Sequence, residues 1–94
     1  MKNEIEIIWS QESLKQIKKL HKQLSETEAK KYLNKIAEII LDIQNNPFAG
    51  IGKLEHLKYK LPPCWSRRIN IKDRLIYRVS TNRIEIISIL GHYN

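Results

Sequence analysis

The apolar residues of this chain change their spacing twice, and this change restricts the folds that the chain can adopt. Between Glu4 and Trp9 apolar residues alternate with acidic ones, which predicts a half-buried strand. From Ser10 to Asn45 apolar residues recur every three or four positions, which predicts amphipathic helices. After Pro47 short apolar segments typical of strands follow one another. This order of elements predicts an α+β fold.

The helical region contains its own break. Ser10 is placed to cap a first helix. The apolar stripe of that helix is formed by Leu14, Ile17, Leu20 and Leu24. Residues 25–28 have the spacing of a capping box, so they end the first helix and begin a second one. The second helix ends at Asn45-Asn46-Pro47, because a residue before proline avoids the helical conformation. So short a connection predicts an antiparallel helical hairpin.

The second half of the chain predicts three or four strands. Residues 47–55 read as a loop in which Gly50 and Gly52 permit unusual backbone angles. The expected strands run from His56 to Leu61, Trp65 to Asn70, Arg74 to Val79 and Ile84 to Leu90. We therefore expect a single domain over residues 1–94, with both helices on one face of a largely antiparallel sheet. The other face would be free to bind a partner.

The central hairpin decides which of two neighbouring arginines shares a face with Arg74. Residues that lie opposite each other in an antiparallel pair point to the same side of the sheet. A loop of odd length around residues 70–73 places Arg68 on the face of Arg74, whereas a loop of even length places Arg67 there. The sequence leaves both arrangements open.

The charge of the chain indicates a polyanionic partner. Lys and Arg total 17 against 10 acidic residues, which gives a net charge of +7 and a pI near 9.7. Nucleic acid is the first candidate and an acidic protein the second, beside the plain alternative of a protein that is merely basic. No segment has the apolar length of a signal peptide or a membrane helix, so we expect a cytoplasmic protein with no membrane partner.

The sequence offers no recognisable metal or cofactor site. Cys64 is the one cysteine, which excludes an intramolecular disulfide and a cysteine-based zinc site. Motifs such as HExxH and a glycine-rich phosphate loop are absent, so no metal and no cofactor is expected. The C-terminal half instead holds a carboxylate, histidines and cations suited to acid–base chemistry on phosphate. They are Glu55, His56, Lys58, Arg67, Arg68, Arg74, Arg78 and His92.

Several segments together resemble the YoeB/Txe toxins of the RelE/ParE superfamily. Residues 46–58, Asn-Pro-Phe-Ala-Gly-Ile-Gly-Lys-Leu-Glu-His-Leu-Lys, are similar to the loop of these toxins. Trp-Ser-Arg-Arg-Ile at 65–69 and Asp-Arg-Leu-Ile-Tyr at 73–77 are similar to their central hairpin. Ile-Trp-Ser at 8–10 and Gly-His-Tyr at 91–93 also match, so the likeness spans nearly the whole chain. Asn94 extends the chain beyond the usual terminal His-Tyr.

The resemblance implies a catalytic set of three residues. Glu55 matches the general base that takes the proton of an RNA 2′-hydroxyl, and His92 matches the general acid. Arg74 matches the arginine that stabilises charge on the phosphate. Without the resemblance, Glu55 would be read as an ordinary loop carboxylate and His92 as a solvated tail residue.

Further residues are implied to bind RNA or phosphate. Lys58 and Arg68 match supporting basic residues near the scissile phosphate, and Tyr93 matches a terminal aromatic that positions the substrate. Charge alone suggests nucleic-acid contact for Arg67 as well.

The function implied is that of a ribosome-dependent mRNA endoribonuclease, an mRNA interferase that is the toxin of a type II toxin–antitoxin pair. It would cut message in the ribosomal A site without a metal and so inhibit translation. The implied partners are the ribosome with its mRNA and an acidic, partly disordered antitoxin, and a homodimer is a further expectation. Two alternatives share the fold: a ParE-like toxin that inhibits DNA gyrase, and a non-catalytic RNA- or protein-binding module.

Overall fold

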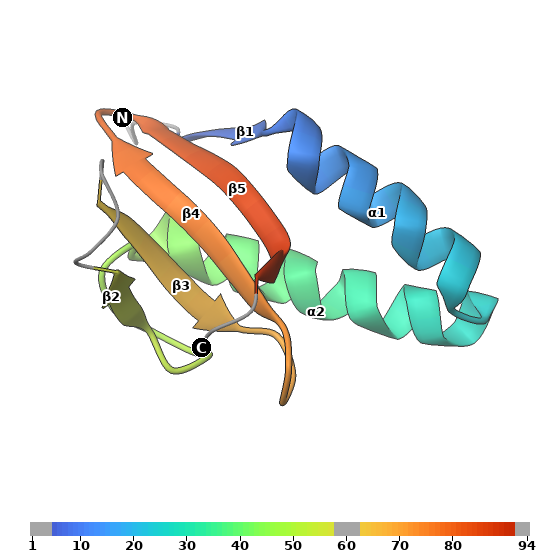
Figure 1. The fold of residues 1–94 in the computed structure, drawn as a ribbon. Helices are drawn as coiled ribbons and strands as arrows, with labels where there is room; N and C mark the ends of the chain where they lie inside the picture. The colour runs from blue at the N-terminus through green and yellow to red at the C-terminus, as the bar shows by residue number, and fades with distance from the viewer. Residues whose placement is uncertain (1–4, 58–62, 92–94) are drawn as a thin grey trace.

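Two helices and a five-stranded sheet make up the fold of the computed structural model, which describes residues 5–57 and 63–91 (Figure 1). The elements follow the order strand, two helices, four strands, so the predicted α+β architecture is confirmed. Among the described residues, no helix is both long enough and apolar enough to span a bilayer.

Both helices begin at the serines that the sequence pointed to. Helix α1 is Gln11–Gln23, and the Ser10 hydroxyl at its N-cap accepts a hydrogen bond from the Ser13 amide. Helix α2 is Glu26–Asn45, where Ser25 and Glu28 form the complete capping box. The two helices run in opposite directions and splay into a V in Figure 1, with α2 lying across one face of the sheet and α1 beside β5.

The sheet is mixed, with strand order β1-β5-β4-β3-β2. Its strands are β1 (Glu6–Trp9), β2 (Glu55–Leu57), β3 (Cys64–Arg68), β4 (Arg74–Ser80) and β5 (Arg83–Gly91). Strand β1 pairs in parallel with β5, and the other neighbours are antiparallel. The expected strand from residue 56 to 61 begins one residue earlier, and its part beyond Leu57 lies outside the described residues.

The main core lies between α2 and the sheet. Its fully buried residues come from α2 (Ile36, Ile39, Ile43) and from β4 and β5 (Leu75, Tyr77, Ile84, Ile86, Ile89). Burying each of these large side chains contributes roughly 1.5–3 kcal/mol. A second, smaller apolar cluster of Leu57, Cys64 and Ile76 lies on the other face.

The β3–β4 hairpin shows which of Arg67 and Arg68 shares a face of the sheet with Arg74. Arg68 lies opposite Arg74, and the loop between them, residues 69–73, has odd length. Strand β3 ends at Arg68 instead of Asn70, because the Asn70 side-chain oxygen accepts hydrogen bonds from the amides of Lys72 and Asp73 and so starts the turn. Arg68 therefore shares the helix-free face with Arg74, and Arg67 points to the helix side.

Candidate functional site

A carboxylate and a guanidinium meet on the helix-free face of the sheet. Glu55 is the first residue of β2 and Arg74 the first residue of β4, with β3 between the two strands. The Arg74 Nη1 donates a hydrogen bond to the Glu55 Oε1 at 3.3 Å. The Glu55 side chain is 50% exposed, so a ligand can reach the carboxylate. Two residues that are distant in the sequence and were predicted to act together are thus in contact.

Arg68 brings a second positive charge to this site. It lies directly opposite Arg74 in a cross-strand pair, where like charges repel unless an anion separates them. Its Nε is buried and has no hydrogen-bond partner within residues 5–57 and 63–91. Two arginines in this arrangement are suited to binding a phosphate, because guanidinium donors match the geometry of phosphate oxygens.

The remaining predicted members of the site lie outside the described residues. These are Lys58, His92 and Tyr93. The last described residue of β5, Gly91, pairs with Arg74. The chain therefore leaves the described part of the structure beside the Glu55–Arg74 contact.

Arg67 does not belong to this site, and its predicted contact with RNA is corrected. It is fully buried between the sheet and the loop that follows α2. Its guanidinium forms an ion pair with Asp42 and donates to the Tyr77 hydroxyl. Since protein acceptors occupy the guanidinium, it has no donor left for a phosphate. Arg67 points to the helix side because the β3–β4 loop has an odd number of residues, which the sequence alone left open.

His56, one of the acid–base candidates, also faces away from Glu55. Its ring stacks on Trp65 with 4.2 Å between the ring centroids, and Phe48 packs edge-on against the same indole at 5.1 Å. Trp65 is therefore a packing residue, and it joins β3 to the loop before β2.

Asp42 and Tyr77 are two contributors that sequence reasoning missed. The Arg67 guanidinium and the Ile51 amide hold the pKa of the Asp42 carboxyl below its usual value. Burial raises the pKa of Tyr77, and its hydroxyl donates to the Pro47 carbonyl at 2.8 Å. Asp42 lies near the C-terminal end of a helix, where an acidic residue opposes the helix dipole. An acidic residue at that unfavourable position in the sequence indicates that its carboxylate has a specific cationic partner, which is Arg67.

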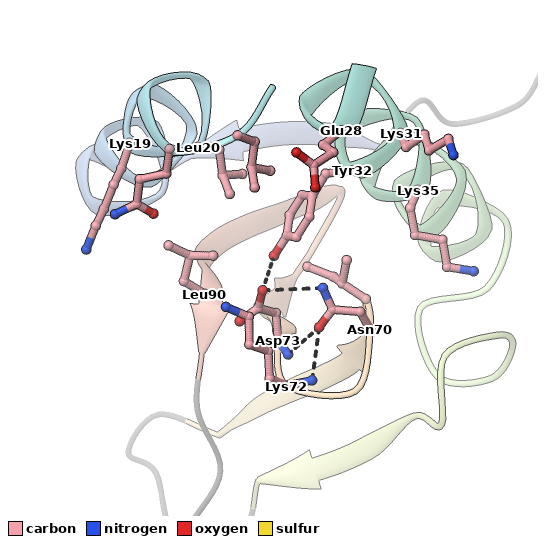
Figure 2. Close-up of a pocket in the computed structure, with 13 residues that line it drawn as sticks. Lys19, Leu20, Glu28, Lys31, Tyr32, Lys35, Asn70, Lys72, Asp73 and Leu90 are labelled. Atoms are coloured by element: carbon pink, nitrogen blue, oxygen red, sulfur yellow. Dashed lines mark hydrogen bonds between the residues drawn. The ribbon is translucent and has the colours of Figure 1, made fainter. Parts of the chain in front are cut away.

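A separate cleft of about 520 Å³ opens between the two helices and the β3–β4 turn (Figure 2). Its apolar lining is formed by Leu20, Leu24, Ile69 and Leu90. Its basic lining residues are Lys19, Lys31, Lys35 and Lys72. Figure 2 shows Lys19 on the side of α1 and Lys31 and Lys35 on the side of α2.

The two acidic groups of this cleft are already engaged. Tyr32 reaches across it from α2 and donates to Asp73 at 2.8 Å, and burial together with this bond raises the pKa of the tyrosine. Glu28 is part of the capping box of α2. The four lysines of the lining outnumber its two carboxylates, although Lys35 also lies 3.9 Å from Glu38, so the cleft keeps a positive charge that suits an acidic ligand.

Metal ligands do not cluster in the described part of the chain. No group of three or more His, Cys, Asp or Glu side chains in residues 5–57 and 63–91 could hold an ion.

Comparison with known proteins connects this fold and site to bacterial toxins. The sequence model described as "YoeB-like toxin of bacterial type II toxin-antitoxin system" matches residues 9–93. The mixed sheet, its basic helix-free face and this match define the class as the toxins of type II toxin–antitoxin systems. Within that class, the chain belongs to the YoeB-like toxin family, as the sequence resemblance indicated.

Relatives match the chain over nearly its full length. Toxin YoeB of an Escherichia coli strain is 39% identical over 89 residues, which cover 95% of this chain and 100% of the relative. A solved YoeB dimer from Staphylococcus aureus is 37% identical with a TM-score of 0.81, covering 95% of this chain and 98% of that one. A heterotetrameric YoeB-YefM toxin-antitoxin complex from the same organism is also 37% identical, with a TM-score of 0.77 and the same coverage.

Proposed function

We propose that this protein is an endoribonuclease that cuts mRNA in the ribosomal A site and so inhibits translation. The observation that carries the proposal is the contact between Glu55 and Arg74, with Arg68 opposite Arg74 on the same open face. This arrangement supplies a proton acceptor beside two cations, which is what cleavage of a phosphodiester by its own 2′-hydroxyl requires.

In the proposed reaction, the Glu55 carboxylate accepts the proton of the 2′-hydroxyl. The 2′-oxygen then forms a bond to the adjacent phosphorus, and the bond from phosphorus to the 5′-oxygen breaks. His92 gives its proton to the leaving 5′-oxygen. The products are a 2′,3′-cyclic phosphate, which can open to a 3′-phosphate, and a 5′-hydroxyl end. This route needs no metal ion.

The cations stabilise the negative charge that builds on the phosphorane. Arg74 and Arg68 present their guanidinium groups from adjacent strands, so one phosphate can receive donors from both. Lys58 supports them in this proposal, and Tyr93 positions the substrate. Removing one preorganised donor of this kind costs an enzyme roughly 100- to 1,000-fold in turnover.

The proposed inhibitor is an acidic antitoxin. The Staphylococcus aureus relative was solved in a toxin–antitoxin complex. In this chain, the cleft of Figure 2 combines an apolar lining with four lysines and two carboxylates, which fits an acidic amphipathic segment better than an RNA backbone. A partly disordered antitoxin would fold onto it and gain affinity from apolar burial and charge together.

A homodimer belongs to the same proposal, since another Staphylococcus aureus relative was solved as a YoeB dimer. Sedimentation equilibrium of the purified chain over a range of concentrations gives the mass directly. A monomer mass at every concentration would remove the dimer from the proposal.

The direct experiment is cell-free translation with the purified protein, followed by primer extension on the message. Cuts are expected only on translated mRNA, and not on the same RNA without ribosomes. Glu55→Ala and His92→Ala should abolish them, whereas Arg83→Ala should not, because Arg83 is an exposed residue that pairs with Glu6.

An intact message with undiminished translation would contradict the proposed nuclease activity. A DNA gyrase supercoiling assay on the same preparation would then test the ParE-like alternative. If Glu55→Ala still cleaves the message, the proposed nuclease activity would stand, but Glu55 would not be its general base.

A further inference from the structure

The guanidinium of Arg67 uses all of its hydrogen-bond donors inside the protein. An arginine side chain carries five N–H groups. The Nε donates to the Tyr77 hydroxyl at 3.1 Å, and the two terminal nitrogens make four further bonds. Their acceptors are the Asp42 carboxylate and the carbonyls of Asn46, Ala49 and Ile51. A side chain so completely satisfied at 0% exposure is built into the fold.

Most of these acceptors belong to one irregular segment, residues 46–52, which follows α2. Besides the three carbonyls bonded to Arg67, the Pro47 carbonyl accepts from Tyr77 and the Ile51 amide donates to Asp42. The Gly52 carbonyl accepts from the backbone amide of Arg68. The segment therefore has few backbone bonds of its own and takes its shape from the Arg67 guanidinium.

Gly50 shows how closely the segment follows the guanidinium. Its φ is +136°, and a Cβ at this position would lie 2.9 Å from the Arg67 Nη1 and would collide with the Asp42 carboxylate. Only glycine fits here, because the backbone must pass against the ion pair in a conformation that other residues avoid.

The segment leads directly to Glu55. Strand β2 is at the edge of the sheet, and its three described residues pair with β3. The pairing of three residues at a sheet edge contributes little to the placement of Glu55. The position of the Glu55 carboxylate against Arg74 therefore depends on how the preceding segment is held.

We infer that Arg67 is a positioning residue of the proposed nuclease site, which holds residues 46–52 so that Glu55 meets Arg74. The inference rests on the proposed function for its catalytic consequence. Arg67 and Arg68 then have different roles on the two faces of β3. Arg67 holds the segment that leads to the base Glu55, and Arg68 faces the phosphate.

Cleavage of mRNA on programmed ribosomes by Arg67→Met tests the inference. A displacement of the base by about 1 Å is expected to lower kcat about 100-fold, while KM stays within about twofold because the substrate-facing cations remain. Asp42→Asn and Tyr77→Phe each weaken one part of the network and should lower kcat by about three- to tenfold on the same basis. Arg83→Met is the matched control and should cleave like the parent protein.

Amide hydrogen exchange supplies a readout that does not depend on activity. Arg67→Met and Asp42→Asn should speed exchange at the amides of Ile51 and Arg68 at least tenfold relative to the parent. Amides in the core of β5 should be unchanged, since their strand neighbours are untouched.

The outcomes separate the inference from the proposed function. If the parent protein cleaves and folded Arg67→Met cleaves equally well, the positioning role is wrong. If Arg67→Met fails to fold, Asp42→Asn decides: an unchanged kcat overturns the inference and a lowered kcat supports it. If the parent protein does not cleave at all, the proposed function is wrong. Unchanged amide exchange at Ile51 and Arg68 in Arg67→Met would then show that Arg67 does not hold residues 46–52 either.

Discussion

Arg67 and Arg68 are consecutive residues with the same side chain and opposite surroundings. Arg67 is fully buried with five hydrogen bonds, and Arg68 lies on the open face with an unpartnered Nε in the described part of the chain. One position of register in a strand reverses the side on which a side chain lies. Arginine is therefore a structural residue at position 67 and faces the open side of the sheet at position 68.

The two arginines should differ in their effect on stability. Arg67→Met leaves Asp42, Tyr77 and several loop carbonyls without their donor, so we expect the free energy of unfolding to fall by about 3 kcal/mol. Arg68→Met should change it by less than about 1 kcal/mol, because the Arg68 Nε makes no hydrogen bond within the described residues. Urea denaturation of both variants and the parent measures this. Equal losses would show that Arg67 and Arg68 contribute alike.

Asp42 should give the fold a dependence on acid. Its hydrogen bond and charge contact with Arg67, with the bond from Ile51, lower its pKa in the folded protein below the ordinary 3.8. Folding therefore favours the ionised carboxylate. Its stabilisation is complete above pH 3.8 and is lost as the pH falls through the lower folded-state pKa. The difference in unfolding free energy between the parent and Asp42→Asn should be largest near neutral pH and shrink in that acidic range. A difference that is constant with pH would contradict this account.

At the scale of elements, α1 completes an edge that β1 leaves open. Strand β1 pairs with β5 only from Arg83 to Ile86, and β5 continues to Gly91. Beyond Ile86 the Ser10 hydroxyl donates to the Ile87 carbonyl, and the Gln16 side-chain oxygen accepts from the amides of Ile89 and Leu90. The register of β5 against β4 is irregular in this part. Helix α1 thus supplies the hydrogen bonds that a longer β1 would have made.

Gln16 can be tested through a pair of substitutions. Gln16→Ala leaves two backbone amides of β5 without an acceptor, so the free energy of unfolding should fall by about 2 kcal/mol. Gln16→Glu keeps the accepting oxygen and should lose less than about 1 kcal/mol. Thermal unfolding, with hydrogen exchange at the Ile89 and Leu90 amides, measures both. If the two variants behave alike, the bonds from the amides are not what Gln16 contributes.

The helices were predictable because their start signals are local. Ser10 and the pair Ser25–Glu28 act within one helical turn, and both predicted helices begin where these residues indicated. The parallel pairing of β1 with β5 was not predictable, since it joins Glu6 to Arg83 from opposite ends of the chain. Alternation in a sequence reveals that a strand has a buried face but not which strand is its neighbour.

The candidate site was only partly predictable. Glu55 and Arg74 were named together by resemblance, and no spacing rule would have brought them into contact across β3. Arg67 was assigned to RNA from its charge alone, and charge does not tell on which face of a strand a side chain lies. The length of the β3–β4 loop, on which its true orientation depends, follows from the hydrogen bonds of the Asn70 side chain.

At the scale of the whole molecule, two separate surfaces among the described residues each bring several positive charges together. Arg68 and Arg74 lie on the helix-free face of the sheet, and the lysines of the cleft in Figure 2 lie between the helices and the β3–β4 turn. The first surface is suited to phosphate and the second to an acidic protein segment. If the proposed function is correct, binding of RNA and binding of an antitoxin should therefore be separable by mutation.

Charge reversal in the cleft tests this separation. Lys31→Glu with Lys72→Glu should weaken antitoxin binding at least about tenfold, while cleavage by the free protein stays within about threefold. Lys18→Glu with Lys22→Glu is the control, because it makes the same change in net charge on exposed residues that do not line the cleft. Isothermal titration with the antitoxin measures the affinities. Equal weakening by both pairs would indicate attraction by overall charge instead of binding in the cleft.

The strand order also bears on how this protein is made. Strand β5 follows the other described elements in the sequence, yet it lies inside the sheet between β1 and β4. The nascent chain consequently cannot complete its sheet until β5 has left the exit tunnel of the ribosome. If the proposed activity is correct, the complete sheet cannot support the Glu55–Arg74 site before β5 has emerged from the ribosome.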